Sequence, residues 1–145
     1  MGATVFETNT AKGAMSWMLQ RGMIVRSSTK DPETFATIQG YIVSEELRDR
    51  IGSNLVRLLG KAAKGNGMGR VTIRDALLTA TMGAVLAIGK TQLSEEEMMQ
   101  FANIIWALLP FERLETAGVT QKPLRSLARD RRLVGKVMRL CSAAR

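Results

Sequence analysis

The chain has 145 residues, which is the usual size of one domain and enough to bury roughly 70% of the unfolded surface. Apolar residues make up 46% and charged residues 23%, a globular composition that excludes disordered, collagen-like and disulfide-built chains. Lysine and arginine number 21 against 13 acidic residues, so the formal net charge is +8. We therefore expect a single basic domain over residues 1–145.

Several kinds of chemistry are excluded by the residues that the chain lacks. It contains no histidine, which removes Ser-His-Asp and Cys-His catalysis and the commonest ligand of zinc, copper and haem. Its single cysteine, Cys141, cannot form an intramolecular disulfide, which suits a reducing compartment such as the cytoplasm. We expect a protein that is not an enzyme and that has no catalytic residues, no metal and no cofactor.

No segment has the length and composition of a membrane span or a secretory signal. The longest stretch without a charge, Ala76 to Gly89, has fourteen residues, whereas a spanning helix needs about 20. The first thirty residues have no basic segment leading into an apolar core. We expect a cytoplasmic protein without a membrane partner.

Apolar residues recur at helical spacing over most of the length, and period-two alternation is nearly absent. The pattern predicts the all-α class: a compact bundle of about five to six helices in a single domain. Only Thr4 to Phe6 and Met23 to Arg26 indicate extended chain. The first helix is expected over Thr10 to Gly22. Asp31 and Pro32, an N-cap followed by proline at the first helical position, predict a second helix through about Val43.

The remaining helices are expected from their start and stop signals. Serine or threonine followed three residues later by an acidic residue is typical of a capping box. Glycine-rich segments and proline end or begin helices. The expected segments are a helix capped by Ser44 to about Lys64, a helix capped by Thr72 to Gly89, a helix capped by Ser94 to Leu109, a short turn through Leu114, and a last helix from Pro123 to Ala143.

The positive charge is concentrated at the C-terminal end. Residues 120–145 carry eight cations against the single acid Asp130, which leaves only +1 on the first 119 residues. On one continuous helix, five cations fall within about 40° of one line and span about 21 Å, long enough to follow several phosphates. Apolar residues cluster on the opposite side. The cations are Arg125, Arg129, Arg132, Lys136 and Arg139, and the apolar residues are Leu127, Val134, Val137, Met138 and Cys141.

A second cationic stripe is expected on the helix that begins after Ser44. Its members recur at helical spacing and are Arg50, Arg57, Lys61 and Lys64. Asn54 lies on the same face between Arg50 and Arg57. The glycine-rich basic loop 64–71 follows; it contains Arg70 and is followed by Arg74, and its backbone amides suit contact with a phosphate. A nucleotide pocket is not expected, because a Walker or dinucleotide loop follows a strand and this loop follows a helix.

Other conspicuous residues have a structural explanation. The acidic groups Glu45–Glu46–Asp49 and Glu95–Glu97 occupy the first turns of expected helices, where they complement the helix dipole. The aromatic residues Trp17, Phe101, Trp106 and Phe111 lie within apolar patterns and are expected in the core or in subunit contacts, not in base stacking.

These features together predict a noncatalytic subunit that binds the phosphates of RNA or single-stranded DNA within a larger nucleoprotein. A chain of this size and helicity, with the Arg125 to Arg139 stripe and no catalytic constellation, resembles the small helical subunits of CRISPR effector complexes. The resemblance implies a subunit that lines up along guide and target strands, in contact with other subunits or copies of itself. Those subunits have no diagnostic motif, so no residue role is carried over from them.

Three alternatives remain open. A small viral nucleocapsid-type protein has the same profile. An interaction module would place its basic helix in a groove of an acidic protein partner. A helix-turn-helix regulator would use residues 123–140, although Arg132 stands where a glycine usually breaks the two helices.

Overall fold

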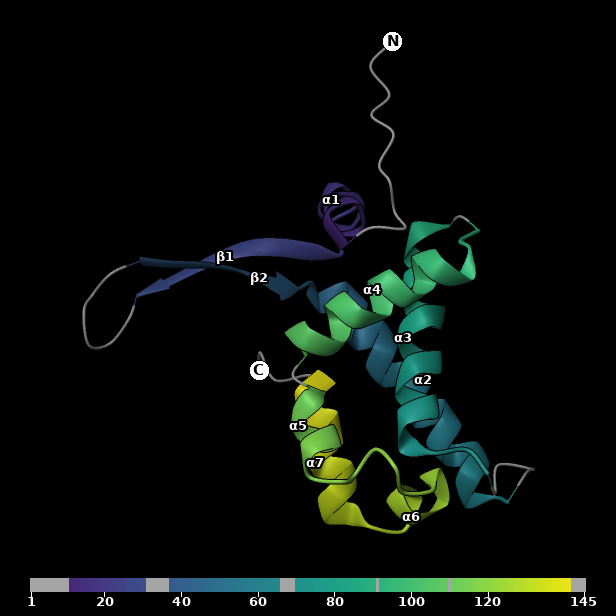
Figure 1. The fold of residues 1–145 in the computed structure, drawn as a ribbon. Coiled ribbons are helices and arrows are strands. Elements are labelled where there is room, and N and C mark those ends of the chain that lie inside the picture. The colour runs from purple at the N-terminus through teal and green to yellow at the C-terminus, as the bar shows by residue number, and fades with distance from the viewer. Residues whose placement is uncertain (1–10, 31–36, 66–69, 91, 110, 142–145) are drawn as a thin grey trace.

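The computed structural model describes residues 11–30, 37–65, 70–90, 92–109 and 111–141, which form an all-α bundle with one β-hairpin (Figure 1). The expected fold class is therefore confirmed. Seven helices occur in these ranges, more than the five to six expected, because the C-terminal segment is divided. The elements are α1 (Ala11–Gln20), β1 (Ile24–Lys30), β2 (Thr37–Val43), α2 (Glu45–Ala63), α3 (Ile73–Gly89), α4 (Glu95–Leu108), α5 (Glu112–Thr116), α6 (Leu124–Ala128) and α7 (Arg131–Cys141).

The prediction of a helix from Asp31–Pro32 to Val43 is wrong, because residues 37–43 form the strand β2. This strand pairs antiparallel with β1, in a register that places Ile24 opposite Val43 and Lys30 opposite Thr37. Its sequence TIQGYIV is rich in the β-branched and aromatic residues that favour strands. The extended chain expected at Met23 to Arg26 supplies the partner strand. Asp31–Pro32 and the expected strand at Thr4 to Phe6 lie outside the described residues.

The two ends of the hairpin have different surroundings. Ile24 and Val43, which pair at the base, are both buried against the helices. Val25 and Ile42, the next pair, are exposed on the other face of the ribbon. Beyond them the hairpin extends away from the helices (Figure 1). Among the hairpin side chains that the structure describes, Ile24 and Val43 at the base are the ones that contribute to the core.

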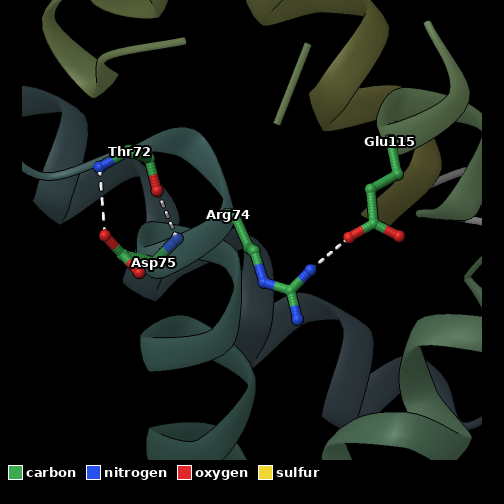
Figure 2. Close-up of polar contacts among 4 residues, drawn as sticks. All are labelled: Thr72, Arg74, Asp75 and Glu115. Atoms are coloured by element: carbon green, nitrogen blue, oxygen red, sulfur yellow. Dashed lines mark hydrogen bonds and ion pairs between the residues drawn. The ribbon is translucent and has the colours of Figure 1, made fainter. Parts of the chain in front are cut away.

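The three long helices begin where their caps were expected. Ser44 accepts a hydrogen bond from the backbone N–H of Leu47 at the start of α2, with a donor–acceptor distance of 3.2 Å. Thr72 and Asp75 form a reciprocal capping box at the start of α3 (Figure 2), and Ser94 and Glu97 do the same at α4. Each cap satisfies backbone donors that a helix start otherwise leaves unpaired.

The core is closed at one end by Trp17 of α1. Its ring lies 4.8 Å from that of Phe101 in α4, measured between centroids, and its edge rests on the backbone of Gly89 at the end of α3. A Cβ atom at Gly89 would lie 2.6 Å from Trp17 Cη2. Trp17, Phe101 and Phe111 are buried, as expected for core aromatics. The absence of a side chain at residue 89 therefore leaves room for the Trp17 indole at the end of α3.

The prediction of one continuous helix from Pro123 to Ala143 is also wrong, because α6 and α7 are separate helices. The chain turns at Arg129–Asp130, between α6 and α7. Asp130 caps α7, because its Oδ1 accepts a hydrogen bond from the backbone N–H of Leu133 at 3.1 Å. Aspartate favours caps over helix interiors because its short side chain competes for backbone donors. The turn lets Leu127 of α6 and Val137 of α7 both reach the core.

Substitution of Gly89 by alanine is expected to destabilise the protein by about 1–3 kcal/mol, since the new methyl group meets the rigid Trp17 indole and overpacks the core. Gly60 of α2 provides the matched control. A Cβ atom there has no neighbour within 4 Å, so Gly60→Ala is expected to raise stability by up to about 1 kcal/mol through helix propensity. Urea unfolding of both variants measures the contrast, and equal shifts would contradict the packing of Trp17 on Gly89.

Candidate nucleic-acid interface

Helix α7 presents a cationic face directly opposite its buried side. Val137 and Cys141 are fully buried, and Val134 and Met138 pack against the core. Three exposed cations lie about 100–180° around the helix axis from Val137 and Cys141. They are Arg132, Lys136 and Arg139. Arg131, at the first position of α7, is exposed as well. We call Arg132, Lys136 and Arg139 the α7 basic row.

The five-membered stripe expected along the C-terminal segment is not one straight line, since the helix is interrupted at Asp130. Arg125 lies on α6 and is half-buried. Arg129 is exposed and ends α6, where its backbone N–H donates to the carbonyls of Ser126 and Leu127. The straight row therefore runs from Arg132 to Arg139, about 10 Å along α7, instead of the expected 21 Å.

The stripe expected on α2 lines a groove between α2 and α3. The groove has a volume of about 390 Å³, and Arg50, Arg57 and Lys61 contribute to its α2 wall. All three side chains are exposed. Lys64, the last member of the expected stripe, is also exposed and lies at the C-cap of α2. The structure therefore brings three of the four expected cations to one groove.

The opposite wall of this α2–α3 groove carries no charge. The wall consists of four small residues of α3: Thr79, Ala80, Gly83 and Ala87. The whole stretch from Ala76 to Gly89 contains no ionisable side chain. Asn54 joins the walls, because its Nδ2 donates a hydrogen bond to the Ala80 carbonyl at 3.0 Å. The groove lining thus has cations on one side and no acid on the other, an arrangement that favours an anionic ligand.

Sequence patterns predict only the α2 wall of this groove. The cationic stripe with Asn54 is predicted from the sequence, but the α3 wall is not. Their spacing, Thr79, Gly83 and Ala87 at i, i+4 and i+8, is the signal that was available, because it places three small residues on one helix face.

Arg70 and Arg74 have different surroundings. Arg74 forms an ion pair with Glu115 of α5 (Figure 2), and its guanidinium lies 5.6 Å from the centroid of the Trp106 ring. The positive charge of Arg74 is therefore balanced by the Glu115 carboxylate. Arg70 is exposed and precedes α3. Of the expected glycine-rich loop 64–71, residues 66–69 lie outside the described residues.

The start of α3 offers few free donors to a phosphate. The backbone N–H of Ile73 donates to the Lys122 carbonyl, and that of Arg74 donates to the Thr120 carbonyl, both at 2.9 Å. The N–H of Asp75 is taken by the Thr72 side chain. The connection between α5 and α6 therefore occupies the positive end of α3, and anion binding is better supported at the side chains of α2 and α7.

The two basic faces lie on different sides of α2. Helix α7 crosses α2 at Gly52, where a Cβ atom would lie 3.5 Å from Met138 Cε. At 100° per residue, Gly52 and Arg57 are about 140° apart around the α2 axis. The α7 basic row and the α2–α3 groove are therefore separate surfaces and not one continuous track.

Within the described ranges, no group of three or more Asp, Glu, Cys or His side chains could hold a metal ion. The acidic residues Glu45, Glu46 and Glu95–Glu97 occupy first helical turns, as expected from the helix dipole. None of the helices in these ranges is both long and apolar enough to cross a membrane.

Comparison with known proteins returns no relative: no family model, no curated protein and no solved structure matches the chain. Function is therefore inferred from the side chains themselves.

Cys141 is expected to be inert in the folded protein. Burial raises the pKa of its thiol from 9.0 to about 11, which keeps the thiol neutral at physiological pH. Iodoacetamide at pH 8 is expected to modify Cys141 only after unfolding. Ser53→Cys in a Cys141→Ala background is the control, because residue 53 is exposed and its thiol is expected to react in the folded state. Equal rates for the two thiols would contradict the burial of α7.

The same pKa shift has a consequence for stability. Because the thiol pKa is higher in the folded state than in the unfolded state, the neutral buried thiol makes its full contribution to the free energy of unfolding below pH 9. That contribution is lost as the pH rises towards about 11. The difference in unfolding free energy between the parent and Cys141→Ala is expected to shrink over this interval in denaturant titrations.

Proposed function

We propose that this protein is a noncatalytic nucleic-acid-binding subunit that contacts phosphates of RNA or single-stranded DNA through basic helix faces. The observation that carries the proposal is the α7 basic row. Arg132, Lys136 and Arg139 are exposed and lie opposite the buried Val137 and Cys141. The helix is thus fixed by its apolar side and leaves its charges to a partner.

Phosphate contact explains the distribution of charge better than solubility alone. Surfaces that serve only solubility mix both signs of charge. In α7 every charged residue is basic, and the lining of the α2–α3 groove contains cations without acids. Each Lys or Arg that neutralises a phosphate releases condensed counterions, so such binding weakens steeply with salt.

A protein of this size makes few phosphate contacts, and we propose that it acts in several copies or inside a larger nucleoprotein. Linked sites raise overall affinity through effective concentration without new contacts. The small helical subunit of a CRISPR effector complex is one assembly of this kind, and a viral nucleocapsid is another. In either assembly the partners are nucleic acid and other protein subunits.

The division of the C-terminal segment supports a second candidate, a helix-turn-helix DNA-binding protein. Helices α6 and α7 are joined by a short turn at Arg129–Asp130, and α7 carries exposed basic residues as a recognition helix does. Selection from randomised duplex DNA separates the candidates, because a recognition helix enriches one sequence and a backbone-binding face enriches none.

The triple substitution Arg132→Gln, Lys136→Gln and Arg139→Gln is expected to weaken binding to unrelated single strands alike. Loss of three phosphate contacts reduces the slope of log K against log salt by roughly 2, at about 0.7 per contact. Helicity and melting are expected to change little, since exposed substitutions usually stay within about 0.5 kcal/mol each. Fluorescence anisotropy over a salt series measures the slope.

The matched control removes the same charge elsewhere. Lys12, Lys90 and Arg113 are exposed and lie on neither basic face, so their triple substitution by glutamine is expected to leave the slope nearly unchanged. If the α7 variant binds RNA and DNA as well as the parent does, the α7 basic row is a docking site for an acidic protein partner, and the proposed function fails for this face.

A further inference from the structure

We propose that the α2–α3 groove holds the sugar–phosphate backbone of one nucleic-acid strand, with the bases directed towards solvent. This inference rests on the proposed function and names the form of ligand that the groove accepts. Its basis is the combination of a row of cations on one wall, an uncharged wall of small residues opposite, and an amide fixed between them.

The cations are arranged along the groove and not across it. Arg50, Arg57 and Lys61 lie on one face of α2, with Asn54 on the turn between the first two, and span about 16 Å of the helix axis. Because all three lie on the α2 wall, they match a single line of phosphates. The α3 wall adds no negative charge between Ala76 and Gly89 that would repel the ligand.

The α3 wall lets a polymer backbone approach closely. Gly83 is exposed and has no side chain, so the space beside Asn54 stays open. A Cβ atom at residue 83 would already lie 3.4 Å from Asn54 Nδ2, and a longer side chain would extend into the groove. Thr79 and Ala87 continue the same face with small side chains. Close approach of a ligand backbone is a usual role of glycine.

Asn54 is a positioned polar group in this groove. One Nδ2 hydrogen donates to the Ala80 carbonyl, which fixes the half-buried amide plane. The amide has a second Nδ2 hydrogen and an Oδ1 acceptor for a ligand. These groups suit a phosphate oxygen and a sugar hydroxyl respectively, and an amide held in place loses little entropy on binding.

The groove geometry favours a single strand over a duplex. The groove lies between two adjacent helices and has a volume of about 390 Å³, so it takes in one sugar–phosphate backbone and not a whole double helix. No aromatic side chain lines the groove among the described residues, so bases have no stacking platform there. Binding is therefore independent of sequence.

Gly83→Gln tests the groove without changing the charge. The side chain fills the space beside Asn54, and glutamine has a better helix propensity than glycine, so the variant is expected to fold. Gly60→Gln is the control, since residue 60 is an exposed α2 position with open space around it. The probes are a fluorescent 20-nucleotide oligo-dT and a random-sequence duplex of 20 base pairs, with anisotropy read over a salt series.

For oligo-dT, Gly83→Gln is expected to raise Kd roughly tenfold near 0.1 M salt and to reduce the salt slope by roughly 2, whereas Gly60→Gln leaves both unchanged. Duplex binding is expected to be the same in the parent and in Gly83→Gln. A second variant, Arg57→Gln with Lys61→Gln, is expected to weaken oligo-dT binding similarly. Its effect should not add to that of Gly83→Gln, because both remove one set of contacts.

The outcomes separate the two proposals. If Gly83→Gln binds oligo-dT as the parent does, the groove inference is overturned while the proposed function stands on the α7 basic row. If duplex binding falls as much as single-strand binding, the groove also holds one strand of a duplex, and the inferred preference for single strands is overturned. If the parent binds neither probe at low salt, the proposed function fails and the groove inference fails with it.

Discussion

The contact between α2 and α3 determines most of the structure. Leu47, Ile51 and Leu55 of α2 and Leu77 of α3 are fully buried, and the hydrogen bond from Asn54 to the Ala80 carbonyl holds the exposed margin of this contact. Small residues of α3 let the two helices come together while leaving a groove on the outside. The packing that forms the core thus also creates the α2–α3 groove with cations along one wall.

The C-terminal helices depend on the other side of α2. Helix α7 places Met138 and Cys141 over Gly52, a position where a larger side chain would hold α7 away. Burial of Val137 and Cys141 then directs Arg132, Lys136 and Arg139 to solvent. Apolar packing therefore decides where the positive charge lies, and the charges themselves contribute little to stability at such exposure.

The connection between α5 and α6 links these two parts. Its carbonyls at Thr120 and Lys122 accept hydrogen bonds from the first turn of α3, and Leu124 donates to the Val71 carbonyl. These bonds satisfy helix donors that otherwise need water or a ligand. They also set the position from which α6 and α7 return to α2, so the two basic faces emerge on opposite sides of that helix.

Local sequence patterns are sufficient to predict the fold class, the starts of α2, α3 and α4, the core aromatics and the amphipathic character of α7. Each of these depends on residues within one or two helical turns, such as Ser94 with Glu97 or Asp75 with Thr72. The hairpin, the turn at Asp130 and the pairing of Arg74 with Glu115 depend on packing in the folded chain. Residues 37–43 and Asp130 have local preferences for a strand and for a helix cap. A strand still needs a partner from elsewhere in the chain, and a helix ends where two apolar faces must reach one core, so the local pattern alone does not decide either result.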